Sequence, residues 1–209
     1  MAARFILFHN PRSRSQRIHW LLEETGAPYE LRPVDLQAGE HRRPDFLRLN
    51  PDGKLPTLID RGPDGTAAVP LTESSAILLH VADAFPEAGM APPPGSLERG
   101  PYLTWVCYAA AALEPALADM VFPRAAPPPP MAIGWPNFEQ ALARVHAALE
   151  PGPWLLGERF SAADIMVGAL LAWVRSWGKL PDPERFDPYL QRLSERPAYR
   201  RAYGDADRA

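Results

Sequence analysis

Three short segments at the start of the chain constrain its fold more than any other feature of the sequence. Residues 4–9 and 29–34 are apolar runs typical of strands. Between them lies a helical pattern that ends at Gly26. Its apolar face carries Ile18, Leu21, Leu22 and Thr25. A strand, a helix and a strand within about thirty residues form a βαβ unit, which requires parallel strands and a right-handed crossover. The chain therefore begins with an α/β domain.

The residues that follow extend the same sheet. Pro44 begins a short helix, which ends at the turn sequence of residues 50–53. Residues 56–60 and 67–71 are strand-like and joined by a turn-rich link, so we expect an antiparallel hairpin. A helix over about residues 74–84 completes the domain. The predicted order is βαβ-αββα.

The second part of the chain has a different pattern. Residues 86–96 are rich in proline and poor in apolar side chains, as in an exposed linker. We therefore predict one domain at residues 1–85 and a second, all-helical domain at residues 97–209. Pro115 should kink the first helix of the second domain, and the prolines within residues 123–136 predict a surface loop.

Composition and charge argue against several classes of function. Twenty-two basic and 25 acidic side chains give a net charge of −3, the wrong sign for binding nucleic acid. No apolar run approaches the ~18 residues of a membrane helix. The single cysteine, Cys107, cannot form an internal disulfide, and we interpret it as a small core residue. We expect a cytoplasmic protein that binds neither metal, membrane nor nucleic acid.

Familiar enzyme motifs are missing from the sequence. It contains no Gly-x-Ser-x-Gly elbow, no Walker loop and no Gly-x-Gly-x-x-Gly after a strand, and its histidines form no i, i+4 pair. This argues against hydrolase, NTPase, dinucleotide-dependent and metal chemistry.

Two groups of polar residues stand where elements of the first domain begin. Glu73 and Ser74 open a helix, whose free amides favour an anion, although Ser74 could equally be a simple cap. Lys54, Leu55 and Pro56 lead into a strand. The bond before Pro56 is either trans or cis, and a cis bond would turn the Leu55 amide and carbonyl outward to pair with another peptide backbone.

A third group stands at the start of the first helix. Ser13 and Ser15 lie beside Arg12 and Arg14. A hydroxyl and free amides there would stabilise a bound thiolate; the alternative is helix capping alone.

Ser161 and Asp164 form a capping-box pattern, and Phe160 can pack on Ile165. We interpret Asp164 as part of the fold and not as a catalytic carboxylate.

Four stretches of the sequence resemble the cytosolic glutathione transferase superfamily, most closely its bacterial and fungal serine-type members. The resemblance covers nearly the whole chain and rests on residues 13–24, 50–58, 73–77 and 154–165. It implies a thioredoxin-like α/β domain followed by an all-α domain, and a homodimer. It also implies glutathione as co-substrate, with no metal.

The resemblance assigns roles to the polar groups of the first domain. Glu73 and Ser74 would bind the γ-glutamyl end of glutathione. Leu55 would pair with the cysteinyl backbone, which implies a cis bond to Pro56. The glycyl carboxylate would meet Lys54 and a residue of a nearby loop, His41 or Arg42.

The position of the catalytic hydroxyl departs from the family pattern. Ser13 is the first candidate and Ser15 the second, with Arg12 or Arg14 as electrostatic alternatives, because counting from the helix places the usual position on Arg12. The absence of a cysteine at this position argues against the thiol-exchange members that reduce mixed disulfides, because their chemistry needs an enzyme thiolate.

A hydrophobic second substrate would bind Trp105 and Tyr108 across the domain cleft, unless both are core aromatics, and the loop of residues 123–136 would cover it. The expected function is glutathione transfer to a hydrophobic electrophile, as in detoxification. The alternatives are a pathway-specific glutathione-dependent isomerase, lyase or dehalogenase, and a non-catalytic glutathione or ligand-binding module.

Overall fold

The computed structural model describes residues 3–126 and 128–204, which divide into two compact units. The first unit contains the residues up to Met90 together with those from Glu195 onward. The second contains Ala91–Ser194. The chain thus returns to its first unit at the end, although the sequence places residues 97–209 together.

The first unit is built on a four-stranded mixed sheet. Its elements are, in chain order, β1 (Phe5–His9), α1 (Ser15–Thr25), β2 (Tyr29–Pro33), α2 (Pro44–Leu49), β3 (Thr57–Asp60), β4 (Val69–Thr72) and α3 (Ser74–Ala84). The strand order is β2-β1-β3-β4. β1 pairs parallel with β2 and antiparallel with β3, which pairs antiparallel with β4. The predicted βαβ-αββα order and thioredoxin-like sheet are confirmed.

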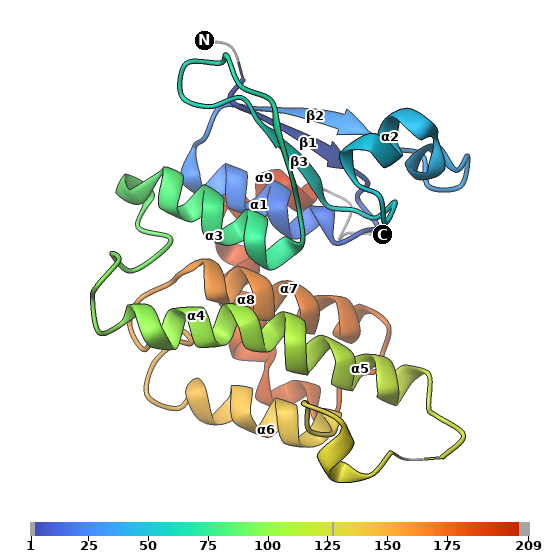
Figure 1. Cartoon of the computed structure of the whole chain (residues 1–209). Coiled ribbons are helices and arrows are strands. Elements are labelled where there is room, and N and C mark those ends of the chain that lie inside the picture. Colours follow the sequence, from blue (N-terminus) through green and yellow to red (C-terminus); the bar gives the residue numbers. More distant parts are fainter. Residues whose placement is uncertain (1–2, 127, 205–209) are drawn as a thin grey trace. The chain divides into compact units, whose positions relative to one another are not determined.

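Helices α1 and α3 lie against one face of this sheet (Figure 1). Their apolar stripes and the alternating side chains of β1 form the core, in which Phe5, Leu7 and Leu21 are fully buried. α2 lies beside the other elements, near the arrowheads of β1 and β2 (Figure 1). The loop that leads to α1 begins directly at the carboxyl end of β1.

The last helix, α9 (Pro197–Tyr203), packs against α1. The Trp20 ring is fully buried and meets Tyr199 edge to face at 4.9 Å between ring centroids. Gln16 Nε2 donates to the Ala202 carbonyl oxygen at 2.7 Å, and Arg196 binds both oxygens of Glu24. These contacts make α9 part of the first unit.

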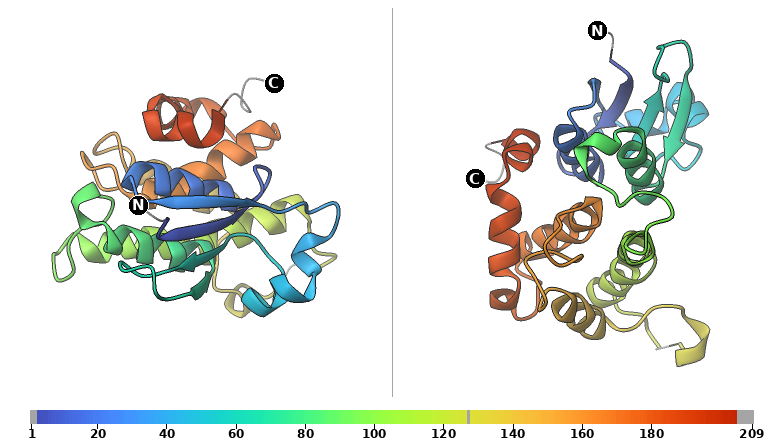
Figure 2. Two further views of the ribbon diagram at one scale, coloured as in Figure 1. Left: turned by 90° about the horizontal axis from the view of Figure 1, so that it is seen from above. Right: turned by 90° about the vertical axis from the view of Figure 1, so that its left-hand side faces the viewer.

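The second unit is helical, as predicted. Its helices are α4 (Arg99–Tyr108), α5 (Glu114–Val121), α6 (Phe138–Ala148), α7 (Ala162–Ser176) and α8 (Asp187–Glu195). α4 and α5 are joined by a π-helical turn, Ala109–Leu113. Pro115 follows that turn and lacks the N–H that would bond back to it, so the irregularity lies where a kink was expected. Figure 2 (right) shows α4 and α6 close to end-on, with α8 seen lengthwise to their left.

Two expectations about side chains in this unit have opposite outcomes. The capping box is confirmed: Ser161 Oγ accepts from the Ala163 amide, and Asp164 Oδ2 accepts from the Ser161 amide at 2.9 Å. Cys107 is exposed, so its interpretation as a core residue is wrong. The buried stripe of α4 contains Trp105 and Val106, and the helical turn places Cys107 off that stripe.

Candidate functional site

The loop between β1 and α1 is held in place by Asn10. Its Nδ2 donates to the Val34 carbonyl at 2.9 Å, and its Oδ1 accepts from the Arg12 amide at 3.0 Å. Its backbone carbonyl accepts from the Ser13 amide at 3.0 Å. Sequence reasoning missed this role of Asn10, because its bonds to Val34 and Arg12 depend on the folded loop.

Ser13 and Ser15, the two candidate hydroxyls, contact each other. Their Oγ atoms lie 2.8 Å apart. Ser13 Oγ also donates to the Asn10 carbonyl at 2.8 Å, and Ser15 Oγ accepts from the Asn10 amide at 3.0 Å. Ser15 has no exposed surface, whereas Ser13 is half-buried. Of the two, Ser13 is therefore the one with exposed surface, and neither is among the residues that line the hollow described below.

Behind Ser15 lies His9, the last residue of β1. Its Nδ1 is 2.9 Å from Ser15 Oγ, and its ring meets the His19 ring edge to face at 5.3 Å. Burial, with a smaller contribution from His19, lowers the pKa of His9 to about 4. The ring is therefore neutral at physiological pH. Sequence reasoning missed this residue, since an isolated histidine at a strand end has no distinguishing pattern.

A hollow of about 420 Å³ lies in the first unit at the starts of α1 and α3. The turn before β3 forms its third wall. The residues that line it are Arg14, Asn50, Asp52, Lys54, Leu55, Pro56, Glu73 and Ser74. The structure thus brings together five of the predicted glutathione-binding residues with Arg14. The lining of the hollow combines positive and negative groups, as a zwitterionic ligand requires.

The buried side chain of Asn50 helps to hold the turn before β3 in place. Asn50 Nδ2 donates to the Lys54 carbonyl at 2.9 Å and to Thr57 Oγ1 at 3.1 Å. The Leu55-Pro56 peptide bond is cis, as the resemblance implied. The sequence motif contained Asn50, but its part in shaping the hollow is visible only in the structure.

Glu73 stands at the N-cap of α3 with a positive φ of 67°. A non-glycine residue in that region is strained, and such strain persists only where its surroundings hold it. The Glu73 side chain is exposed while Ser74 is 8% exposed. The helix start therefore presents a carboxylate, a hydroxyl and free amides together.

His41 and Arg12 do not line this hollow. His41 lies in a 3-10 turn, and its buried Nδ1 has no hydrogen-bond partner among the described residues. Its carbonyl lies close to Gly53, where an added Cβ would come within 2.8 Å of that oxygen. Arg12 is exposed. Of the charged alternatives in the loop before α1, Arg14 is the one that reaches the hollow.

Trp105 and Tyr108 form a separate aromatic pair in the second unit. Their rings meet edge to face at 5.6 Å, and the Arg144 guanidinium carbon lies 5.4 Å and 4.2 Å from the two ring centroids. Trp105 is 8% exposed. Burial raises the pKa of Tyr108, and Arg144 opposes that effect. The pair is thus mostly buried under a cation.

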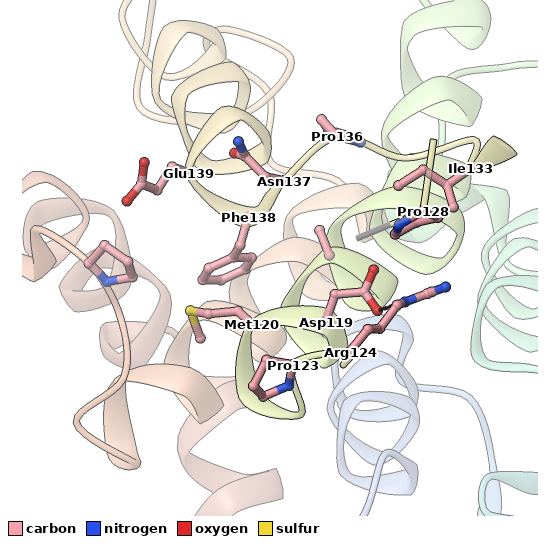
Figure 3. Close-up of a pocket in the computed structure, with 12 residues that line it drawn as sticks. Asp119, Met120, Pro123, Arg124, Pro128, Ile133, Pro136, Asn137, Phe138 and Glu139 are labelled. Carbon is pink, nitrogen blue, oxygen red and sulfur yellow. Dashed lines mark hydrogen bonds and ion pairs between the residues drawn. The ribbon is translucent and has the colours of Figure 1, made fainter. Parts of the chain in front are cut away.

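A second hollow, of about 520 Å³, lies in the helical unit (Figure 3). The end of α5, the proline-rich loop and the start of α6 form it, and Met120 lies beside Phe138. Asp119 accepts from Arg124 Nε and from Trp135 Nε1, each at 2.9 Å, which ties the loop to α5. Trp105 and Tyr108 do not line it.

Within residues 3–126 and 128–204, no group of three or more histidine, cysteine, aspartate or glutamate side chains could hold a metal ion. None of the helices described is long and apolar enough to span a membrane.

Comparison with known proteins places these features in a family. Residues 3–83 match the model of the glutathione S-transferase N-terminal domain, and residues 108–201 match that of the C-terminal domain. The chain is 36% identical over 205 residues to the disulfide-bond oxidoreductase YfcG of Escherichia coli (strain K12), with 96% of this chain and 93% of that protein covered. The chain therefore belongs to the glutathione S-transferase family.

Solved structures of related proteins agree. A sphingomonad glutathione S-transferase, solved with glutathione, is 31% identical with a TM-score of 0.78, over 98% of this chain and all of that one. A glutathione transferase from Burkholderia graminis, with two glutathione molecules bound per subunit, is 28% identical with a TM-score of 0.77. That match covers 99% of this chain and 90% of the other.

Proposed function

We propose that this protein is a glutathione transferase, which binds glutathione in the hollow of the first unit and adds its thiolate to a hydrophobic electrophile. The observation that carries the proposal is the meeting of Lys54, Leu55, Glu73 and Ser74 around one hollow beside the start of α1. Family membership and the glutathione bound in the sphingomonad relative support it.

Each part of glutathione has a chemical counterpart in the hollow. The Glu73 carboxylate binds the γ-glutamyl ammonium, while Ser74 and the amides at the start of α3 bind the γ-glutamyl carboxylate. The backbone of Leu55 pairs with the cysteinyl residue. Lys54 and Arg14 supply positive charge for the glycyl carboxylate, a role for which His41 lies outside the lining.

The thiol is activated at the loop before α1. Ser13 Oγ donates a hydrogen bond to the thiolate, and the amides at the start of α1 add a favourable field. The thiol proton leaves to solvent, and the sulfur then forms the bond to the electrophile. In a substitution the carbon–halogen bond breaks and halide leaves to solvent; in an addition the double bond opens and its other carbon takes up a proton from water. Ser15 is too buried to touch the ligand, so it supports Ser13 from behind. Trp105 and Tyr108 are proposed to bind the electrophile.

Calorimetric titration with glutathione tests the binding site. Ser74→Ala removes a contact to a charged group, and the double variant Glu73→Ala, Ser74→Ala removes two. We expect each lost contact to weaken binding by roughly ten- to a hundredfold, from about 1.5 to 3 kcal/mol per charge-assisted hydrogen bond. Ser75→Ala is the matched control, because Ser75 stands at the same helix start but does not line the hollow. Unchanged affinity in the double variant would exclude this site.

A second candidate is reduction of disulfides by bound glutathione, favoured by the similarity to a disulfide-bond oxidoreductase. The glutathione thiolate would attack one sulfur of the disulfide, the S–S bond would break, and the departing thiolate would take a proton. A second glutathione would then resolve the mixed disulfide and give glutathione disulfide. This route needs no enzyme cysteine. Parallel assays with a small dialkyl disulfide and an activated aryl halide discriminate between the two candidates.

A further inference from the structure

The buried ring of His9 lies at the inner end of a row of three side chains that leads to the candidate thiol-activating hydroxyl. His9 Nδ1 lies 2.9 Å from Ser15 Oγ, which lies 2.8 Å from Ser13 Oγ. We name His9, Ser15 and Ser13 the hydroxyl chain. Nothing in the proposed function uses His9, yet the tautomer of its ring limits how the protons of this chain can be arranged.

A count of donors and acceptors shows why. A hydroxyl oxygen accepts up to two hydrogen bonds and donates one. Ser15 Oγ already accepts from the Asn10 amide at 3.0 Å, and Ser13 Oγ accepts from the Ser15 amide at 3.2 Å. Each hydroxyl therefore has one accepting position left and one proton, and the Asn10 carbonyl is an acceptor within reach of both protons, 2.8 Å from Ser13 Oγ and 3.2 Å from Ser15 Oγ.

We propose that His9 is a positioning residue that acts in its Nδ1–H tautomer. It donates to Ser15 Oγ, and Ser15 Oγ donates to Ser13 Oγ. The Ser13 proton, which the Asn10 carbonyl accepts at 2.8 Å in the structure, then turns to the glutathione sulfur when the ligand is bound. This inference rests on the proposed function and deepens it.

The opposite tautomer would reverse the chain. With the proton on Nε2, the bare Nδ1 would require the Ser15 proton, and Ser15 Oγ would then be free to accept from Ser13. Ser13 Oγ would then lose the hydrogen bond from Ser15 Oγ, and its own proton would have Ser15 Oγ as an inward acceptor besides the Asn10 carbonyl. Only the Nδ1–H form directs the His9 and Ser15 protons toward Ser13, and each bond then polarises the next.

The surroundings of His9 keep its ring neutral, which a defined tautomer requires. Burial and, to a smaller extent, the facing titratable group, His19 of α1, together lower its pKa to about 4. His19 Nε2 is itself 2.9 Å from the Tyr29 hydroxyl of β2, and burial lowers the pKa of His19 as well. The chain transfers no proton in the reaction: it orients a hydrogen bond to the thiolate.

Nitrogen NMR of the histidine-labelled wild-type protein tests the tautomer directly. We expect the His9 signals to show a protonated Nδ1 and an unprotonated Nε2 at neutral pH, with the signals assigned by their loss in His9→Asn. A protonated Nε2 with a bare Nδ1 would overturn the proposal. This measurement does not depend on enzymatic activity. The one variant that it requires is His9→Asn, for the assignment.

The pKa of glutathione bound to the enzyme, followed by the ultraviolet absorbance of its thiolate, tests the function of the chain. Ser13→Ala should raise this pKa by about one to two pH units. His9→Leu removes the ring donor. At a pH below the pKa of bound glutathione, it should lower the fraction present as thiolate by about two- to threefold, which is a part of the effect of one hydrogen bond. His9→Asn keeps an N–H donor at the Nδ1 position and should titrate like the wild type.

A double variant separates the chain from a merely structural effect. In a Ser13→Ala background, His9→Leu should cause no further change in the pKa of the bound thiol, because the ring acts through Ser13. An equal change in both backgrounds would overturn the proposal. If His9→Leu does not fold, Ser15→Ala breaks the same chain at a small side chain and should raise the thiol pKa only when Ser13 is present.

The failure of this inference and that of the proposed function are distinguishable. If calorimetry shows that wild-type protein binds no glutathione, the proposed function fails and the inference fails with it. If glutathione binds and Ser13→Ala raises the pKa of its thiol, while His9→Leu and Ser15→Ala titrate like the wild type, then only the chain is wrong.

Discussion

At the scale of single residues, burial raises the pKa of a carboxyl group, whereas the hydrogen bonds that its carboxylate accepts lower that pKa. Burial raises the pKa of Asp164 to about 6 against the hydrogen bonds that it accepts. Asp60 shows the opposite balance: burial alone would raise its pKa, but hydrogen bonds from Arg4, His80 and the Gly62 amide hold it at about 2. The two carboxyl groups therefore affect stability in opposite directions as the pH falls.

Asp60 should make a stabilising contribution that acid removes. Its pKa in the folded protein lies below the ordinary value of 3.8, so the contribution is complete above pH 3.8 and is lost as the pH falls toward 2. We expect Asp60→Asn to lower the free energy of unfolding by about 2 kcal/mol at neutral pH, and by much less near pH 2. Urea unfolding of both proteins across this range measures the difference.

The control for that change is Asp64→Asn in the same β3–β4 connection. Asp64 is exposed, and its carboxylate accepts from the Thr66 amide in the turn. Exposed charge interactions contribute little, so this variant should follow the wild type closely. A difference between wild type and Asp60→Asn that does not shrink with acid would mean that the ion pair is not its source.

At the scale of elements, sequence patterns predicted what depends on local spacing. The strands, α3 and the capping box of α7 follow from apolar periodicity and from residues three or four positions apart. The packing of α9 on α1 does not, because Gln16 and Ala202 are 186 residues apart. The site shows the same limit: its helix-start residues were predicted, while His9, Asn10 and the burial of Ser15 required the folded loop.

The contact between α7 and α8 shows how one glycine sets the distance between two helices. A Cβ on Gly168 would lie 2.2 Å from Leu193 Cδ1 and 3.5 Å from the Tyr189 hydroxyl oxygen. Leu193 is itself buried, so it has little room to move. We expect Gly168→Ala to destabilise the protein by about 1 to 3 kcal/mol, the usual effect of overpacking. The midpoint and slope of chemical unfolding give this value.

Gly100→Ala provides the comparison on another helix of the same unit. Gly100 lies in α4, and an added Cβ would meet nothing within 4 Å. Alanine should therefore be neutral or stabilise by up to about 1 kcal/mol through helix propensity. Equal effects at the two positions would show that the close approach of Leu193 does not require a glycine at position 168.

At the scale of the whole molecule, the chain leaves its first unit at Met90 and returns to it at Glu195. The returning segment covers Trp20, which has no exposed surface, and pairs with Glu24, whose side chain is 8% exposed. Both lie on α1, the helix that begins at the hydroxyl chain. The stability of the helix that carries the site therefore depends on residues at the far end of the sequence.

Truncation after Ser194 tests that dependence. It removes Tyr199 from the face of Trp20 and leaves the Glu24 carboxylate without Arg196. Uncovering one large aromatic side chain costs about 1.5 to 3 kcal/mol, and loss of the ion pair adds to it, so we expect the free energy of unfolding of the first unit to fall by at least about 3 kcal/mol. Thermal unfolding with and without glutathione measures the change. Truncation after Gly204 removes none of these contacts and should unfold like the full chain, whereas a similar loss in both truncations would show that packing of α9 on α1 is not the cause.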